Sequence, residues 1–228
     1  MRRGVLIVFA KRPEPGRVKT RLSPPLTPVQ AAELYRAMLG DVLEASAAMA
    51  ARGGLDPVLA VAPAEAGAEL AQSAPPSFRV VAQRGADLSE RMEWAVAEAA
   101  ASGGAPILLR GSDSPALDPG AALEALDALI DHDLVLCPDL DGGYGLVGLA
   151  RTAPALFSHP MSTRRVLEDT HSRALHQGLR VKLLTPRFDI DGFDDLQRLA
   201  ALRETPVGAL CAQTLTYLDV HALWPKRR

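Results

Sequence analysis

Positive charge is concentrated in one short segment near the start of the chain. The apolar run 5–10 is bounded by turn residues and predicts a buried first strand. The eleven residues after it contain five cations, with Gly16 among them: Lys11, Arg12, Arg17, Lys19 and Arg21. Charges this close repel one another unless an anion lies among them, and open α/β sheets bind ligands at the carboxyl ends of their strands. The pattern therefore favours a phosphate site over a solvated loop.

Two acidic groups follow other predicted strands. Asp113 comes directly after the apolar run 106–109, and Asp189 and Asp191 follow the run 181–184. A carboxylate suits a hard divalent cation such as Mg²⁺ or Mn²⁺, which prefers oxygen ligands and keeps water and phosphate oxygens as its other ligands. The local alternatives are a turn at Asp113 and a helix N-cap at Asp191. We expect Asp113, with Asp191, to bind the metal.

Three further segments could contact a substrate. The Asp-Gly-Gly-Tyr sequence at 141–144 lets the backbone approach a ligand closely, and a hairpin turn is the alternative. Gln83 could reach a nucleobase edge, with Gly85 left for close packing, in what is otherwise a loop before a helix. The Ser-Thr pair at 162–163 reads as a helix start, whose N-terminus could also hold an anion.

Strands and helices alternate along the chain. The predicted strands are 5–10, 58–61, 78–81, 106–109, 134–137, 145–149 and 181–184. The predicted helices are 28–53, 64–72, 88–101, 119–130, 162–176, 193–203 and a segment within 207–224; Thr27 and Asp87 have the sequence of N-caps. This alternation predicts a three-layer α/β/α domain with a mostly parallel sheet. The link between 137 and 145 is too short for a helical crossover, so part of the sheet should be antiparallel.

Composition narrows the class of protein. The 228 residues suffice for a single domain over 1–228, and the net charge of −2 gives no reason to expect nucleic acid as a partner. No apolar run approaches the roughly 18 residues that span a bilayer, and the run 5–10 is too short for a signal peptide. We therefore expect a cytoplasmic protein without a membrane partner. Cys137 and Cys211 have no metal-type spacing and are expected in the core.

The motifs, taken in order, resemble a bacterial family of GT-A-like transferases that includes glycosyltransferases assigned to arsenosugar biosynthesis. The resemblance covers about residues 5–196 and lies in 9–11, 15–16, 18–22, Gln83, Gly85, 87–88, 90–92, 111–115, 141–144, 162–163 and 189–191. It implies the nucleotide-diphospho-sugar transferase fold, which phospholactate and molybdenum-cofactor guanylyltransferases share. The chain departs from the family's pattern at Gly145, at Met161 and at the pair 192–193. These departures bear on which acceptor is used more than on nucleotide binding.

The resemblance implies a metal-dependent glycosyltransferase that uses a nucleoside-diphosphate sugar and a small-molecule acceptor. Its nucleotide and phosphate contacts would be Ala10, Lys11, Arg12, Gly16, Arg17, Lys19, Arg21, Gln83 and Gly85. Its substrate contacts would be Gly142, Gly143, Tyr144, Ser162 and Thr163, and the catalytic groups Lys19, Arg21, Asp113, Asp141 and Asp189. One alternative is a nucleotidyltransferase that joins a nucleoside triphosphate to a phosphorylated acceptor. Another is a non-catalytic nucleotide-binding regulator, which the presence of Asp113 and Asp191 disfavours.

Overall fold

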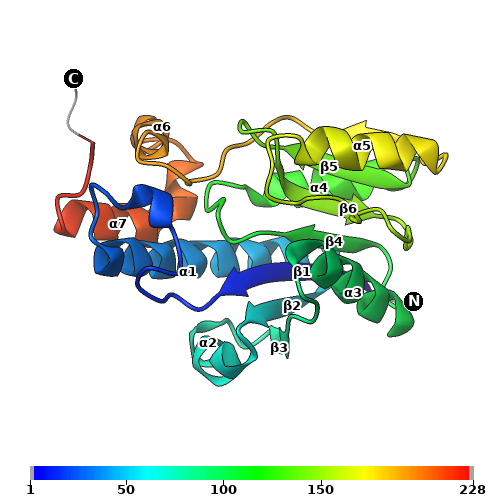
Figure 1. The fold of residues 1–228 in the computed structure, drawn as a ribbon, viewed down its shortest axis with the longest axis horizontal. Helices are drawn as coiled ribbons and strands as arrows, with labels where there is room; N and C mark the ends of the chain where they lie inside the picture. Colours follow the sequence, from blue (N-terminus) through cyan, green and yellow to red (C-terminus); the bar gives the residue numbers. More distant parts are fainter. Residues whose placement is uncertain (1–2, 226–228) are drawn as a thin grey trace.

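One seven-stranded sheet organises the chain (Figure 1). The computed structural model describes residues 3–225. The strands are β1 (Gly4–Lys11), β2 (Leu55–Ala62), β3 (Arg79–Ala82), β4 (Ile107–Arg110), β5 (Leu134–Pro138), β6 (Tyr144–Leu149) and β7 (Val181–Leu183). Their order in the sheet is β3-β2-β1-β4-β6-β5-β7, and β6 runs antiparallel to both neighbours while all other pairs are parallel. The predicted mixed, mostly parallel sheet is confirmed, including its antiparallel part.

Helices cover both faces of the sheet (Figure 1). They are α1 (Pro28–Gly53), α2 (Gly67–Ser73), α3 (Leu88–Ala101), α4 (Pro119–Ala128), α5 (Val166–His176), α6 (Asp195–Ala201) and α7 (Ala212–Val220). Side chains of α3 and α5 pack on one face, and those of α1, α2 and α4 on the other. The helices α6 and α7 pack against the first half of α1. Of the helices in residues 3–225, none is long and apolar enough to cross a membrane.

The alternation of side chains along β1 explains the three layers. Ile7 and Phe9 face the α3 and α5 layer, whereas Leu6 and Val8 face the layer of α1. A strand that is buried on both faces must be apolar at every position, which is why the run 5–10 carried no polar residue. Cys137 and Cys211 are buried free thiols, in agreement with the expectation.

The helix starts follow local capping chemistry. The Thr27 hydroxyl accepts from the Gln30 amide at 3.2 Å and the Gln30 side chain accepts from Thr27 N at 2.8 Å, which completes the predicted capping box of α1. Asp87 Oδ1 accepts from Glu90 N at 2.9 Å, as predicted for α3. The capping residues alone located both helices correctly.

The prediction that Ser162 caps α5 is wrong by three residues, because α5 begins at Val166 and its N-cap position is Arg165. Residues 162–165 form a turn instead, in which the Thr163 hydroxyl accepts from Arg165 N at 3.2 Å. The Gly142 carbonyl accepts from Leu167 N at 3.0 Å and so fixes this turn against the loop between β5 and β6. The predicted helices 119–130 and 193–203 also end early, and the tail contains a 3-10 turn, Gly208–Cys211, before α7.

Asp41→Ala should lower the free energy of unfolding by about 3 kcal/mol. Asp41 lies in α1 with 1% of its surface exposed, and its carboxylate accepts from Gln213 N, Thr214 N and the Thr214 hydroxyl at 2.6–2.9 Å. The two amides open α7, so the substitution leaves buried donors of a helix N-terminus without a partner. Urea unfolding measures the loss, and an effect below about 1 kcal/mol would contradict it.

The pH dependence of Asp41 gives a second measurement on the same contact. Burial raises the pKa of the Asp41 carboxyl above its usual value, against the opposing effect of the hydrogen bonds from Thr214. The protonated form is therefore favoured more in the folded chain than in the unfolded one. We expect the stability of the wild type relative to Asp41→Asn to fall as the pH rises from the unfolded-state pKa through the folded-state pKa.

Candidate functional site

A continuous cleft lies at the carboxyl ends of β1 and β4. It consists of two adjoining cavities of about 540 and 720 Å³. The smaller cavity, here called the basic half, is lined by Lys11, Arg17, Lys19, Arg21 and Arg91. The larger cavity, the acidic half, is lined by Asp113, Asp139, Asp141, Asp189 and Asp191. Both halves contact Lys11, Arg21, Asp113 and Asp191, so these four residues mark the junction.

Lys19 joins the two carboxylates for which the sequence predicted a metal. Its Nζ lies 2.5 Å from Asp113 Oδ1 and 3.0 Å from Asp191 Oδ1, and 4% of its side chain is exposed. Arg21 Nη1 contacts the other oxygen of Asp191 at 3.4 Å. Segments that are 172 residues apart in sequence thus meet at one ammonium group. The structure brings together the predicted groups Lys19, Arg21, Asp113 and Asp191.

The charge of Lys19 is stabilised by its partners. Burial on its own would lower the pKa of Lys19, but the nearby carboxylates of Asp113 and Asp191 outweigh this and raise it above the usual value. The side chain remains a cation at neutral pH. Its backbone is held in the left-handed region, with φ of 47° and ψ of 39°, which a residue with a Cβ seldom adopts.

The carboxylates of Asp113 and Asp191 converge on the ammonium group of Lys19. Both place an oxygen around one point, and the cationic nitrogen of Lys19 marks that point. Within residues 3–225 no cluster of three or more His, Cys, Asp or Glu residues could hold a metal by itself. Two protein carboxylates with phosphate oxygens and water are a sufficient set for Mg²⁺. The residues fit a metal that is shared with a phosphorylated ligand.

Tyr35 connects the basic segment to the Asp113 segment, and sequence reasoning missed it. Its hydroxyl accepts from Lys11 N at 3.0 Å and shares a hydrogen bond of 2.7 Å with Ser112 Oγ. Burial raises the pKa of Tyr35 to about 12, so the phenol keeps its proton. A tyrosine in the middle of a helix gives no local signal of this contact, because its partners lie 24 and 77 residues away.

Arg110 lies beneath the cleft and was also missed. Its side chain is fully buried and donates to the Ser114 carbonyl at 2.6 Å and to Ser46 Oγ at 3.2 Å. Burial lowers the pKa of Arg110 to about 10, still well above neutral pH. The hydroxyl of Ser114 in turn donates to Asp189 Oδ1. Arg110 therefore supports the segment that positions Asp189.

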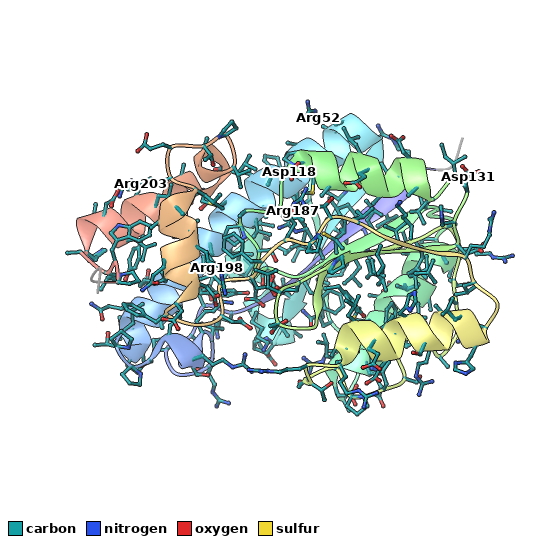
Figure 2. All side chains as sticks on the ribbon, turned by 90° about the horizontal axis from the view of Figure 1, so that it is seen from above. Arg52, Asp118, Asp131, Arg187, Arg198 and Arg203 are labelled. Atoms are coloured by element: carbon teal, nitrogen blue, oxygen red, sulfur yellow. The ribbon has the colours of Figure 1, made fainter. Side chains whose placement is uncertain are left out.

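Asp189 and Asp139 lie side by side in the acidic half. Burial raises the pKa of Asp189 well above its usual value, and the neighbouring Asp139 carboxylate acts in the same direction. The segment that carries Asp189 is anchored by Arg187, whose Nη2 lies 3.2 Å from Asp118 Oδ2 at the start of α4 (Figure 2). Asp191 does not cap α6, since Asp195 accepts from the Asp191 and Gly192 amides instead. The Asp191 carboxylate is left to face the cleft.

The turn between β5 and β6 borders the acidic half. Gly142 has φ of 95°, and Gly143 N donates to Asp141 Oδ1 at 3.1 Å. Tyr144 lines the cleft with its ring while its hydroxyl accepts from Thr170 of α5 at 3.3 Å. The predicted substrate contacts Gly143, Tyr144, Ser162 and Thr163 all line this cavity, and Gly142 lies directly beside them.

The loop after β3 closes the basic half. Both hydrogens of the Gln83 amide are used, on the Ala10 carbonyl at 3.1 Å and the Ala60 carbonyl at 2.9 Å. Its oxygen is therefore the group that could accept from a nucleobase. Gly85 has φ of 130°, and a Cβ there would come within 2.8 Å of Arg91 N. Gln83 and Ala10 line the cavity, whereas Gly85 shapes the loop behind it.

Arg12 is separated from the other cations. Its Nε donates to Glu69 Oε2 of α2 at 2.8 Å, and within residues 3–225 neither it nor Gly16 lines the cleft.

We expect Arg17→Met to weaken binding of inorganic pyrophosphate and Arg12→Met to leave it unchanged within about twofold, because Arg17 lines the basic half and Arg12 does not. Calorimetric titration of both variants tests this, and equal losses would contradict the separation.

The seven-stranded mixed sheet with helices on both faces is a nucleotide-diphospho-sugar transferase-like fold. The crystal structure of a proposed nucleotide-diphospho-sugar transferase from Desulfovibrio desulfuricans G20 matches 97% of this chain and 99% of its own, with 27% identity and a TM-score of 0.81. Residues 45–163, just over half of the chain, match DUF2064, a family described as uncharacterized proteins conserved in bacteria, and the protein belongs to it.

More distant structures share the fold alone. A cytidylyltransferase from Leptospira borgpetersenii serovar Hardjo-bovis matches 98% of this chain and 96% of its own, with 11% identity and a TM-score of 0.58. Rv0371c from Mycobacterium tuberculosis H37Rv matches 88% of this chain and 99% of its own, with 19% identity and a TM-score of 0.53. No curated protein matches the chain.

Proposed function

We propose that this protein is a metal-dependent glycosyltransferase that takes a nucleoside-diphosphate sugar as donor and a hydroxyl group of a small molecule as acceptor. The observation that carries the proposal is the division of one cleft into a basic and an acidic half, with Asp113 and Asp191 at the junction. A diphosphate fits the first half and an uncharged acceptor the second. The class proposed for the 27% identical relative, a nucleotide-diphospho-sugar transferase, supports the donor class.

The basic half would bind the donor. Its cations Lys11, Arg17 and Arg21 offset the charge of a diphosphate, and an arginine can contact two oxygens at once. Asp113 and Asp191 would hold Mg²⁺ or Mn²⁺ against the phosphates, where the metal would stabilise the negative charge of the departing diphosphate. Contacts within the chain hold these groups in place. On the phosphate side, Tyr35 contacts the Lys11 amide and Ser112, the residue before Asp113. On the carboxylate side, backbone hydrogen bonds hold the segment that follows β7 and carries Asp191.

The acidic half favours glycosyl transfer over nucleotidyl transfer. Five aspartates line it, and its cations are Arg164 and the junction residues Lys11 and Arg21. A phosphorylated acceptor, which nucleotidyl transfer needs, would enter a cavity of like charge. A hydroxyl acceptor would not be repelled, and it requires a group that takes its proton. Asp189, positioned by Ser114, is our candidate for that group, and the exposed Asp141 on the turn is the second.

Product analysis tests the proposal. The protein is incubated with Mg²⁺ or Mn²⁺, a panel of nucleoside-diphosphate sugars and a panel of polyhydroxylated small molecules, and in parallel with nucleoside triphosphates and sugar phosphates. Release of a nucleoside diphosphate from one donor supports glycosyl transfer. Release of pyrophosphate from a triphosphate would replace it by nucleotidyl transfer, and binding without any product would indicate a regulator.

A pair of variants then assigns the proton acceptor. Asp189→Asn and Asp141→Asn remove one carboxylate each from the same cavity without changing its size. Loss of product formation in the first variant alone assigns the role to Asp189. Loss in the second alone assigns it to Asp141.

A further inference from the structure

We propose that Lys19 competes with the metal for Asp113 and Asp191 and that a bound diphosphate relieves this competition. Its ammonium group lies between one oxygen of Asp113 and one oxygen of Asp191, where a divalent cation would bind. The side chain leaves that point when the metal enters and turns to the phosphates. The inference rests on the proposed function, since it concerns the order in which the same site takes its ligands.

The contacts exclude simultaneous occupancy. Lys19 Nζ lies 2.5 Å and 3.0 Å from one oxygen of each aspartate. Mg²⁺ binds carboxylate oxygens at about 2.0–2.1 Å, so a metal held by Asp113 Oδ1 and Asp191 Oδ1 would need the space that the ammonium group takes. A metal that binds these two oxygens must therefore displace the lysine.

Displacing the lysine is energetically costly unless it gains a new partner. With 4% of its side chain exposed, it is almost fully removed from water, and removing the partners of a buried charge is strongly unfavourable. The basic half offers the replacement, because a diphosphate among Lys11, Arg17 and Arg21 would bring several anionic oxygens next to Lys19. Metal and diphosphate should consequently bind with positive coupling, which is reciprocal by thermodynamic necessity.

The backbone at Lys19 is consistent with a position that is held in place. Its φ of 47° is in the left-handed region, and the 3-10 turn Thr20–Leu22 starts immediately after it. Such a conformation persists in a residue with a Cβ only where surrounding contacts determine it. The contacts of the Lys19 side chain with Asp113 and Asp191 help to hold this backbone conformation. If Lys19 moved to a new partner, these contacts would be lost.

Direct Mn²⁺ binding to the full chain tests the inference. The variant Lys19→Met keeps the length of the side chain and removes the ammonium group. The matched control is Arg21→Met, which removes a cation from the same Asp191 carboxylate but from an exposed position at 3.4 Å. Affinities for Mn²⁺ alone are measured by electron paramagnetic resonance on each protein, after circular dichroism has confirmed the fold.

We expect Lys19→Met to bind Mn²⁺ about tenfold tighter than the wild type, because apparent affinity falls with the fraction of molecules whose carboxylates are free. Arg21→Met should change the affinity much less. Equal increases in the two variants would mean general charge repulsion and would overturn the inference, as would equal affinity of wild type and Lys19→Met. Both results leave the proposed function standing. Absence of Mn²⁺ binding in all three proteins would overturn the inference together with the metal dependence of the proposed function.

Lysine labelling gives an independent readout on the wild type. Acetic anhydride followed by mass spectrometry reports which lysines are accessible, and the exposed Lys11 serves as the internal reference. We expect Lys19 to be protected in the free chain, to react when saturating Mn²⁺ is present, and to be protected again when inorganic pyrophosphate is added. Protection of Lys19 that does not change with bound Mn²⁺ would overturn the inference.

Discussion

Asp113→Asn should lower turnover of the proposed reaction by about 10²-fold or more, while the free energy of unfolding changes by about 1 kcal/mol. Asp113 provides one of the two carboxylates at the junction of the cleft, and its side chain is 44% exposed, so its loss removes charge without opening the core. The amide that replaces it keeps the shape but binds a divalent cation weakly. The measurements are kcat/KM with Mg²⁺ and urea unfolding.

The control for this variant is Asp141→Asn, which removes a carboxylate of the same cavity that does not contact Lys19. It should retain metal-dependent stabilisation by a nucleoside diphosphate in thermal unfolding, and Asp113→Asn should lose it. If Asp113→Asn turned over at the wild-type rate, Asp113 would not be a metal ligand.

Gly142→Ala should destabilise the protein by about 2–4 kcal/mol and abolish product formation. A Cβ at this position would come within 2.0 Å of the Arg164 carbonyl oxygen, and φ of 95° is unfavourable for alanine. The contact is with backbone, so no side chain can move aside to relieve it. The turn between β5 and β6 would have to separate from residues 162–164, which line the same cavity. Urea unfolding and the product assay measure the two effects.

Gly143→Ala is the matched control, one residue further along the turn. The nearest atom to its Cβ would be Asp141 Oδ1 at 3.3 Å, the end of an exposed side chain. We expect a loss of stability of less than about 1 kcal/mol. Equal destabilisation by both substitutions would show that the close approach at Gly142 is not what fixes the turn.

The parts of the fold that the sequence predicted correctly depend on local chemistry. Thr27 and Asp87 act within three residues of themselves, so their helices could be located from the sequence. The antiparallel β6 followed from a connection that was too short for a helix. The start of α5 was missed because Ser162 is a good capping residue locally, whereas the contact between Gly142 and the turn at 162–165 is a tertiary one.

For the candidate site, the sequence predicted the position at one edge of the sheet but not the contacts within it. The residues of that edge follow strands, and the order of strands and motifs indicates which loops share it. The pairing within the cleft was not accessible, because Lys19 and Asp191 are 172 residues apart and Arg12 pairs with Glu69 from another helix. Arg110 was missed for a related reason: a charged residue at the end of a strand normally indicates exposure, and here two acceptors in the core satisfy part of the side chain.

The reversed direction of β6 has a consequence for the evolution of specificity. Because β6 returns antiparallel between β4 and β5, the hairpin turn at 139–143 reaches the ligand edge of the sheet, and it lines the acidic half. The basic half is built from segments that precede this hairpin in the chain, together with Ser162 and Asp191. If the protein has the proposed function, substitutions or insertions in one short hairpin alter which acceptor is used while the loops of the basic half and their buried support remain unchanged. Members of one family could in this way keep a common donor and diverge in product.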